Sequence, residues 1–137
     1  MFWLRIEACL SGLKKPLPIT GTGEETRDFT FVRDIVDGTL RMGVVKEAVG
    51  EAVNLASETE TRVIDLANWI NELTGNDAGI VFRSRRDWDE VVKRRASIEK
   101  ARKILEYKPK TGIRSVLKKT YNWIFENREK IEACVKF

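Results

Sequence analysis

The sequence predicts a mixed α/β fold in which helix exceeds strand. Apolar residues recur every three or four positions in several segments, which is typical of amphipathic helices, whereas short apolar runs bounded by glycine or polar turns indicate strands. The two patterns alternate along the 137 residues and give the order α, β, α, β, α, β, α, α. This length is typical of one domain with one core, and no internal repeat or low-complexity linker divides it.

Five segments carry the helical period, and capping or breaking residues set their limits. Thr61 and Ser97 are good N-cap residues, and Gly75 is a typical helix stop. In the fourth helix, Glu99 near the start and Lys103 near the end match the helix dipole. The expected helices cover residues 3–13, 32–45, 61–74, 98–105 and 111–129.

Three short apolar segments are expected to be extended, at residues 29–32, 52–56 and 79–83. Polar or glycine-containing turns separate them from the neighbouring helices. The segment 17–20 is predicted to be an irregular or extended link, because Pro16 and Pro18 cannot donate hydrogen bonds to a strand ladder.

Composition narrows the class of protein. Hydrophobic residues make up 42% and charged residues 34% of the chain, as in a soluble globular protein. No apolar run approaches the roughly 20 residues of a membrane span. Arg5 and Glu7 interrupt the apolar start of the chain, so we expect no signal peptide and a cytoplasmic location.

Cys9 and Cys134 lack the spacing of a metal site, and the absence of histidine removes the commonest general base and most zinc sites.

The net charge of +4 is unevenly distributed. Between Arg83 and Lys119 there are 14 Lys and Arg residues against 5 Asp and Glu residues, a local charge of +9. Such a block indicates a polyanionic partner, either the phosphates of a nucleotide or a nucleic acid, or simply a solvated charged face.

The stretch from Gly21 to Asp34 contains the most suggestive residues. A glycine turn precedes Arg27, whose guanidinium offers a planar fork that matches phosphate oxygens. The spacing Gly21-x-Gly23-x-x-Thr26 is close to that of a dinucleotide-binding loop, but such a loop follows a buried strand and opens a helix. Here prolines precede the turn and an extended segment follows it. Taken alone, the stretch is consistent with an anion grip, but also with an ordinary strand-connecting loop that carries a surface arginine, which is the commoner case.

Several stretches in this order resemble the C-terminal part of the extended short-chain dehydrogenase/reductase family, the NAD-dependent nucleotide-sugar epimerases and dehydratases. UDP-glucose 4-epimerase is the best-known type. The resemblance extends from about residue 2 to residue 128, and the order and spacing of the motifs carry it. The motifs are Leu17-Pro18-Ile19-Thr20-Gly21-x-Gly23, Thr26-Arg27-Asp28-Phe29-Thr30-Phe31-Val32-Arg33-Asp34, Val53-Asn54-Leu55-Ala56-Ser57, Arg85-Arg86-Asp87-Trp88-Asp89, Arg95-Ala96-Ser97-Ile98-Glu99-Lys100-Ala101 and Leu105-Glu106-Tyr107-Lys108-Pro109.

The resemblance implies a set of substrate-binding residues, because in that family the C-terminal region closes over the nucleoside diphosphate of a sugar donor such as a UDP- or dTDP-sugar. Arg27 and Arg86 match the two arginines that grip the diphosphate. Asp89 resembles the acidic residue that contacts the ribose or orders the arginine loop. Pro18 and Thr20 lie in a segment similar to the strand whose backbone reads the nucleobase edge. Two guanidiniums on separate loops are able to neutralise a diphosphate from two sides.

The resemblance also implies what the chain lacks. Residues 1–137 are expected to form a single nucleotide-sugar-binding C-terminal domain, the small substrate-binding domain of an extended short-chain dehydrogenase/reductase, without most of the Rossmann sheet or the N-terminal NAD-binding domain. The family's Tyr-x-x-x-Lys pair is missing, since Tyr107 is followed four positions later by Thr111 and Tyr121 by Phe125. We therefore expect no catalytic residue and no cofactor in this chain, although NAD is implied for the full-length family. A truncated or split UDP-glucose 4-epimerase-like protein fits this pattern.

The same resemblance implies that the chain associates with a partner. In the family, the helix matching residues 32–45 and the strand matching 52–56 pack onto the dinucleotide-binding sheet. We therefore expect a separate Rossmann-domain chain, or a homo-oligomer formed by domain swapping. The alternative function is a non-enzymatic basic module that binds nucleic acid or another polyanion. Nucleic acid is less favoured, because Trp88 and Tyr107 are the only aromatic residues of the basic block.

Overall fold

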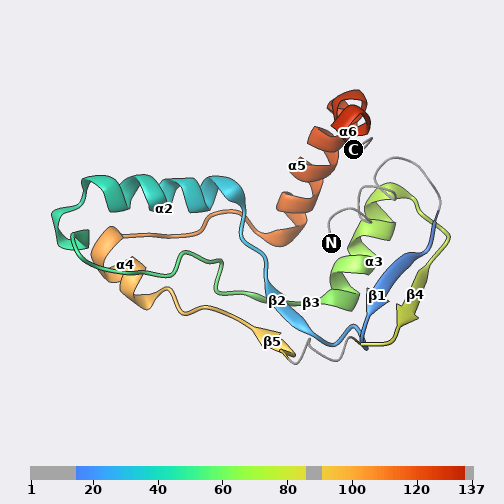
Figure 1. Ribbon diagram of the computed structural model, residues 1–137, viewed down its shortest axis with the longest axis horizontal. Coiled ribbons are helices and arrows are strands. Elements are labelled where there is room, and N and C mark those ends of the chain that lie inside the picture. Colours follow the sequence, from blue (N-terminus) through green and yellow to red (C-terminus); the bar gives the residue numbers. More distant parts are fainter. Residues whose placement is uncertain (1–14, 86–90, 135–137) are drawn as a thin grey trace. The chain divides into compact units, whose positions relative to one another are not determined.

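The computed structural model describes residues 15–85 and 91–134 (Figure 1). The chain divides into two compact units, unit 1 with residues 1–25, 62–90 and 114–137, and unit 2 with residues 26–61 and 91–113. None of the helices in the described ranges has both the length and the apolar character of a membrane span. The expected single domain over residues 1–137 stays a prediction, and the first expected helix, 3–13, lies outside the described residues.

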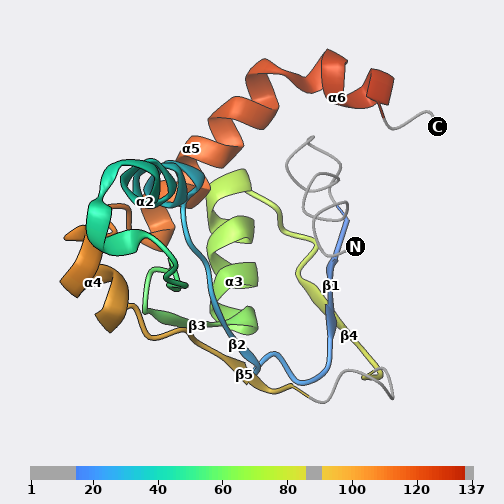
Figure 2. The same cartoon turned by 60° about the vertical axis from the view of Figure 1, so that its left-hand side comes forward.

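Unit 1 contains a parallel strand pair with a helix beside it. β1 (Leu17–Thr20) pairs with β4 (Ile80–Arg83), with Leu17 opposite Ile80. α3 (Val63–Thr74) lies next to β1 (Figure 1, Figure 2). The buried hydrophobic residues of β1 and α3 are Leu17, Ile19, Leu66, Ala67 and Ile70.

Residues 17–20 form a regular strand, so of the two predicted forms, irregular or extended, the extended one is present, and it pairs in a ladder despite the prolines. The backbone N–H of Leu17 donates to the carbonyl of Gly79 at 2.9 Å. The N–H of Gly21 donates to the carbonyl of Arg83 at 3.0 Å. Because backbone groups alternate in direction along a strand, the nitrogen of Pro18 points away from β4, where the ladder requires no donor.

The predicted last helix, 111–129, is interrupted. α5 (Ile113–Glu126) ends before Asn127, and α6 (Arg128–Cys134) continues beyond the predicted limit. The side-chain amide of Asn127 donates to the carbonyl of Trp123 at 2.9 Å, and the backbone N–H of Asn127 donates to the same oxygen at 3.0 Å. A side chain that competes with the backbone in this way is a physical cause of such a break.

Unit 2 combines a small sheet with helices. Its strands are β3 (Glu60–Arg62), β2 (Thr26–Asp28) and β5 (Lys93–Arg94), in the order β3-β2-β5, and β2 pairs with β5 in parallel. The helices are α2 (Val32–Val44), the short 3₁₀ helix η1 (Lys46–Ala48) and α4 (Glu99–Leu105). The buried core consists of Ala48, Ala56, Ile98, Ala101, Leu105 and Tyr107. These elements confirm the mixed, helix-rich α/β class for the described residues.

Two predicted extended segments are placed differently. The extended segment predicted at residues 29–32 is displaced: the strand found there, β2, ends at Asp28, and residues 29–31 lead directly into α2. Residues 52–56 form no strand in the described part of the chain, so the prediction of a short strand there was wrong. Ala56 is buried, and Val53 and Leu55 pack against the core of unit 2, so burial rather than strand pairing explains their apolar pattern.

The limits of α2, α3 and α4 are close to those predicted, but the N-cap of α3 differs from the predicted one. Gly75 ends α3 in the left-handed conformation, with φ of 62°, as expected of a helix stop. Thr61 lies in β3 instead of capping α3. The first N–H groups of α3, those of Val63 and Ile64, donate to backbone carbonyls of the glycine loop that precedes β2, at Glu25 and Gly23.

Two glycines of α2 provide a matched test of this packing. A β-carbon at Gly38 would lie 2.6 Å from Cδ2 of Leu55 and 3.1 Å from Cδ2 of Tyr107, whereas no described atom lies within 4 Å of the same position at Gly43. We expect Gly38→Ala to lower the free energy of unfolding by about 1–3 kcal/mol through overpacking. Gly43→Ala is expected to raise it by about 0.5–1 kcal/mol, because alanine favours helix. Urea unfolding followed by circular dichroism measures both, and equal effects at the two positions would contradict the packing.

Candidate functional site

Arg27 lies in the middle of β2, and backbone carbonyls of Thr26 and of Val92, the residue before β5, hold its side chain. Nη1 of Arg27 donates to the carbonyl oxygens of Thr26 at 2.8 Å and Val92 at 3.0 Å. The backbone N–H of Thr26 also donates to the carbonyl of Val92, at 3.0 Å. The guanidinium is half-buried and positioned next to the strand pair, which limits the freedom that a surface arginine normally has.

Arg94 of β5 is the register partner of Arg27. Register partners in a parallel pair project from the same face of the sheet, on strands about 4.8 Å apart. Two guanidinium-bearing residues therefore lie side by side, and Arg94 is exposed. An arrangement of like charges on neighbouring strands favours an anion as the third partner. No sequence pattern indicated Arg94, because β5 has only two residues and both are charged.

Asp28 organises the loop opposite β2 in unit 2. Its carboxylate accepts hydrogen bonds from the N–H of Ser57 at 3.0 Å, the hydroxyl of Ser57 at 2.5 Å and the N–H of Glu58 at 2.9 Å. Glu58 has φ of 61°, a left-handed conformation that costs free energy for a residue with a side chain. The Asp28 bonds and the ion pair between Glu58 and Arg102 at 2.5 Å hold it there.

Tyr107 has a structural role in unit 2. Its ring is fully buried, and its hydroxyl donates to the carbonyl of Ala56 at 3.3 Å. Burial raises the pKa of Tyr107, and the negative charges of Asp34, Asp28 and Asp37 raise it further. A tyrosine that is buried, hydrogen-bonded and held protonated in this way stabilises the core of unit 2 and is not poised for proton transfer.

A hollow of about 180 Å³ lies on unit 2. Asp34, which is buried, accepts a hydrogen bond from the N–H of Thr111 on its wall at 3.1 Å. The lining mixes hydroxyl groups with apolar side chains and comprises Phe29, Ser57, Thr59, Thr61, Pro109, Lys110, Thr111, Gly112 and Ile113. None of the substrate-binding residues predicted from the sequence belongs to this lining.

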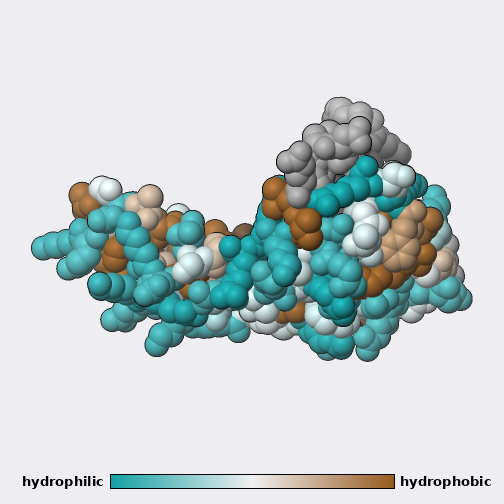
Figure 3. All heavy atoms as spheres, turned by 90° about the horizontal axis from the view of Figure 1, so that it is seen from below, coloured by the Kyte–Doolittle hydropathy of each residue, from teal (hydrophilic) through white to brown (hydrophobic). Residues whose placement is uncertain are grey.

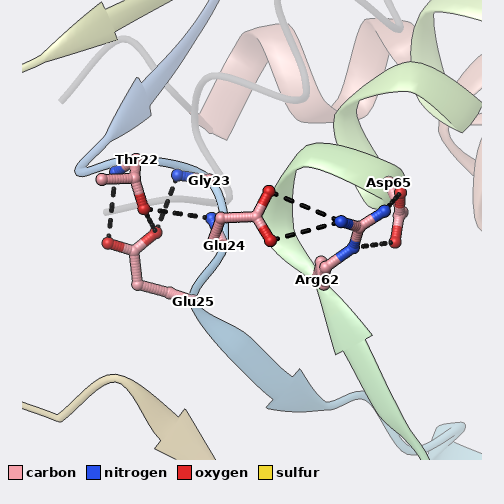
Figure 4. Close-up of polar contacts among 6 residues, drawn as sticks. All are labelled: Thr22, Gly23, Glu24, Glu25, Arg62 and Asp65. Atoms are coloured by element: carbon pink, nitrogen blue, oxygen red, sulfur yellow. Dashed lines mark hydrogen bonds and ion pairs between the residues drawn. The ribbon is translucent and has the colours of Figure 1, made fainter.

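The glycine loop of unit 1 is filled by its own carboxylate (Figure 4). Glu25 is 7% exposed, and its carboxylate accepts hydrogen bonds from the N–H groups of Gly23 at 2.8 Å and Thr22 at 3.2 Å. Gly21 and Gly23 have φ of 99° and 85°, which lets the chain turn around that carboxylate. The N–H groups that would cradle the pyrophosphate of NAD are thus already bonded. The loop does not fit that cofactor, which agrees with the interpretation of the sequence.

Opposing influences act on the pKa of Glu25. Burial is the largest single one and raises the pKa. The N–H donors of its own loop and the positive charge of Arg85 together outweigh burial, so that the net pKa is lowered. Glu25 is therefore ionised at neutral pH, and its charge is part of what orders the loop.

Neighbouring Glu24 belongs to an exposed ion-pair network (Figure 4). Arg62 contacts Asp65 through two bonds of 2.8 Å and contacts Glu24 at 3.2 Å. The hydrogen bonds that Arg62 donates to Asp65, and then those that it donates to Glu24, raise the pKa of Arg62. Because these groups are exposed, solvent screens the pairs and their effect on stability is small.

The structure describes three of the five predicted binding residues. Pro18 is half-buried and Thr20 is exposed in β1 of unit 1, and Arg27 belongs to unit 2. Arg86 and Asp89 lie outside the described residues. Among the described residues, no group of acidic or cysteine side chains is arranged to hold a metal ion.

Comparison with known proteins identifies the family. The family model described as GDP-mannose 4,6 dehydratase matches residues 3–120. The chain belongs to this family. It is therefore a member of the NAD-dependent epimerase/dehydratase group that the motifs around Arg27 and Tyr107 indicated, and that prediction is confirmed.

Solved structures of the family resemble this chain closely. An epimerase of Methanothermobacter thermautotrophicus has 49% sequence identity and a TM-score of 0.91, over 96% of this chain and 39% of its own. The Bordetella bronchiseptica enzyme WbmF, solved in complex with NAD⁺ and UDP, has 37% identity and a TM-score of 0.80, over 96% of this chain and 38% of its own.

A curated relative gives the same picture. UDP-glucuronic acid decarboxylase 2 of Arabidopsis thaliana is 36% identical over 104 residues, which are 76% of this chain and 23% of that protein. The chain thus spans about a quarter to two fifths of the length of these relatives. The likeness therefore concerns only the part of those proteins that this chain matches.

The ionised Glu25 gives a pH-dependent prediction. Because the folded carboxylate has a lowered pKa, its stabilising effect is complete above the pKa of an unfolded glutamate, about 4.3, and is lost as pH falls through the lower folded-state pKa. We expect Glu25→Gln to lower the free energy of unfolding by about 1–2 kcal/mol at pH 7. The difference from wild type should shrink as pH falls below about 4.

Urea unfolding at a series of pH values measures this difference. Glu126→Gln, at an exposed position of α5, is the matched control and should behave like wild type throughout. A loss in Glu25→Gln that stays the same size across the acid range would contradict a role for the Glu25 charge.

Proposed function

We propose that this chain is a nucleoside-diphosphate-sugar-binding part of an NAD-dependent epimerase or dehydratase, similar to UDP-glucose 4-epimerase, with a UDP- or dTDP-sugar as ligand. The observation that carries the proposal is the guanidinium of Arg27, held half-buried beside β5 and next to a second arginine. Family membership supports it. Relatives solved with UDP or UDP-glucose support the ligand class.

The proposed roles follow from charge and position. Arg27 and Arg86 bind the diphosphate from two sides with charge-assisted hydrogen bonds. Asp89 contacts the ribose or orders the arginine loop. The backbone around Pro18 and Thr20, at the end of β1, reads the edge of the nucleobase.

The chain is proposed to bind rather than to convert the sugar. Its sequence contains no Tyr-x-x-x-Lys pair, and Tyr107 is buried in the core of unit 2. The glycine loop is filled by Glu25, which leaves its N–H groups unavailable to a dinucleotide. In this proposal a Rossmann domain outside residues 1–137 supplies NAD and the acid/base groups.

Exposed hydrophobic residues support association with such a partner or with a second copy. Val32, Val36, Leu40 and Val44 recur every fourth position of α2 and are 48–80% exposed. Unit 1 also carries surface hydrophobic residues, which gather over the region of β1 and β4 (Figure 3). Val81 and Phe82 of β4 are exposed there. Stripes of this kind mark interaction surfaces.

The ligand prediction is tested by calorimetric titration of the purified chain with UDP. Arg27→Ala and Arg86→Ala should each weaken binding at least about tenfold, because each removes a charge-assisted hydrogen bond of about 1.5–3 kcal/mol. Lys118→Ala, at an exposed position of α5, is the control and should bind like wild type. If all three variants weakened binding equally, with a steep dependence on salt, the basic-module alternative would be favoured instead.

The association prediction is tested by size-exclusion chromatography with light scattering. The wild-type chain should have a mass above that of a monomer, and Leu40→Lys should lower the mass by placing a charge within the apolar stripe. Thr39→Lys adds the same charge at the adjacent exposed position and should leave the mass unchanged. A monomeric wild-type chain would contradict self-association through α2.

A further inference from the structure

Residues 91–95, which include β5, form a strap along β2 with few attachments of their own. Val91 and Val92 are 42% and 44% exposed, and residues 93–95 are exposed as well. Within the ranges that the structure describes, the side chains of the strap form no ion pair and no hydrogen bond. The strap is therefore held to unit 2 by its backbone and by the groups of β2 that reach it.

Two donors from β2 meet on one oxygen atom of the strap. The carbonyl oxygen of Val92 accepts the backbone N–H of Thr26 at 3.0 Å and Nη1 of Arg27 at 3.0 Å. The same Nη1 donates to the carbonyl of Thr26 at 2.8 Å. The guanidinium thus joins its own strand to the strap, and lifting the strap would break both of the bonds to Val92.

The far end of the strap is anchored in the core of unit 2. Ile98 is 0% exposed, and Ala96 packs against the same core. β5 has only two residues and lies at the edge of the described sheet, in the order β3-β2-β5. A short edge strand with exposed side chains belongs to the least stable part of a fold, which opens locally while the core stays closed. The buried Ile98 limits such an opening to the strap.

The guanidinium of Arg27 is the element that the strap shares with a ligand. An arginine side chain has many rotamers, and both the bond to Val92 and a contact to a diphosphate require it to keep one orientation. The first of these contacts to form bears that loss of freedom, so the second forms at a lower entropic cost. The effect is reciprocal, because a ligand that favours the closed strap is itself bound more tightly by it.

We propose that the strap is a conformational device of the binding site: it lifts from β2 and closes again in the free chain, and a diphosphate bound at Arg27 favours the closed form. This inference rests on the proposed function, because it takes Arg27 as the contact to the diphosphate. It gives Arg27 a second role, as the positioning residue that holds the strap on β2.

Hydrogen exchange of backbone amides, followed by NMR with and without saturating UDP, tests the coupling. The N–H of Thr26 reports on the closed strap, because it donates to Val92. The N–H of Thr111 donates to Asp34 in the same unit and is the internal control. In the wild-type chain, UDP should slow exchange at Thr26 about tenfold and at Thr111 by less than about twofold.

Two matched arginine-to-lysine variants separate the strap contact from the charge. Arg27→Lys keeps the positive charge but lacks the planar fork, so exchange at Thr26 in the free chain should be at least about tenfold faster, as expected for the loss of one charge-assisted hydrogen bond. Arg94→Lys makes the same change at the register partner, whose side chain forms no bond to another described residue, and should exchange like wild type. Circular dichroism establishes that each variant is folded.

The contrary outcomes are distinct from one another. Equal slowing at Thr26 and Thr111 means that UDP stabilises unit 2 as a whole, and it overturns the inference. Unchanged or faster exchange at Thr26 with UDP overturns it as well, since strap and ligand are then independent or compete for Arg27. Equal exchange in Arg27→Lys and Arg94→Lys shows that Arg27 does not hold the strap.

Calorimetric titration of the wild-type chain with UDP checks the proposed function separately. Binding without selective slowing at Thr26 leaves the proposed function standing and ends the inference. If UDP does not bind, the proposed function fails and the inference fails with it.

Discussion

The carbonyl oxygen of Val92 joins the two features on which the proposed site depends. It accepts the backbone N–H of Thr26 at 3.0 Å, which aligns β2 with β5, and it accepts Nη1 of Arg27 at 3.0 Å. One acceptor therefore sets both the strand register and the position of the guanidinium. Because the register places Arg94 opposite Arg27, the charge of the site follows from the same pairing. Such preorganisation lowers the entropic cost of binding an anion.

Carboxylates that are buried or half-buried keep the surrounding loops in place. Asp28 holds the turn at Ser57 and Glu58, Asp34 holds Thr111, and Glu25 fills the glycine loop of unit 1. In each case a charged acceptor satisfies backbone N–H groups that would otherwise be unpaired, which is among the stronger polar contacts available to a folded chain. These acids therefore act as parts of the scaffold.

Sequence reasoning succeeded where the information is local. The periodicity of α3, the stop at Gly75 and the strand β4 need only neighbouring residues, and all three were predicted closely. The motif around Arg27 identified the family and the arginine now found beside β5. The pairing of β2 with β5 was missed because its partners are separated by more than 60 residues and β5 contains only Lys93 and Arg94. The strand predicted at residues 52–56 was wrong for a different reason. Their apolar residues pack against the core of unit 2, and they pair with no strand in the described ranges.

The central claim is that the β2–β5 pair is the diphosphate grip, and backbone amide NMR of the chain during titration with UDP tests it most directly. The account predicts saturable shifts concentrated at the amides of Thr26, Arg27 and Asp28 and of their partners Lys93 and Arg94. Shifts that fail to saturate and are instead distributed over the lysines and arginines of α4 and α5 would contradict it.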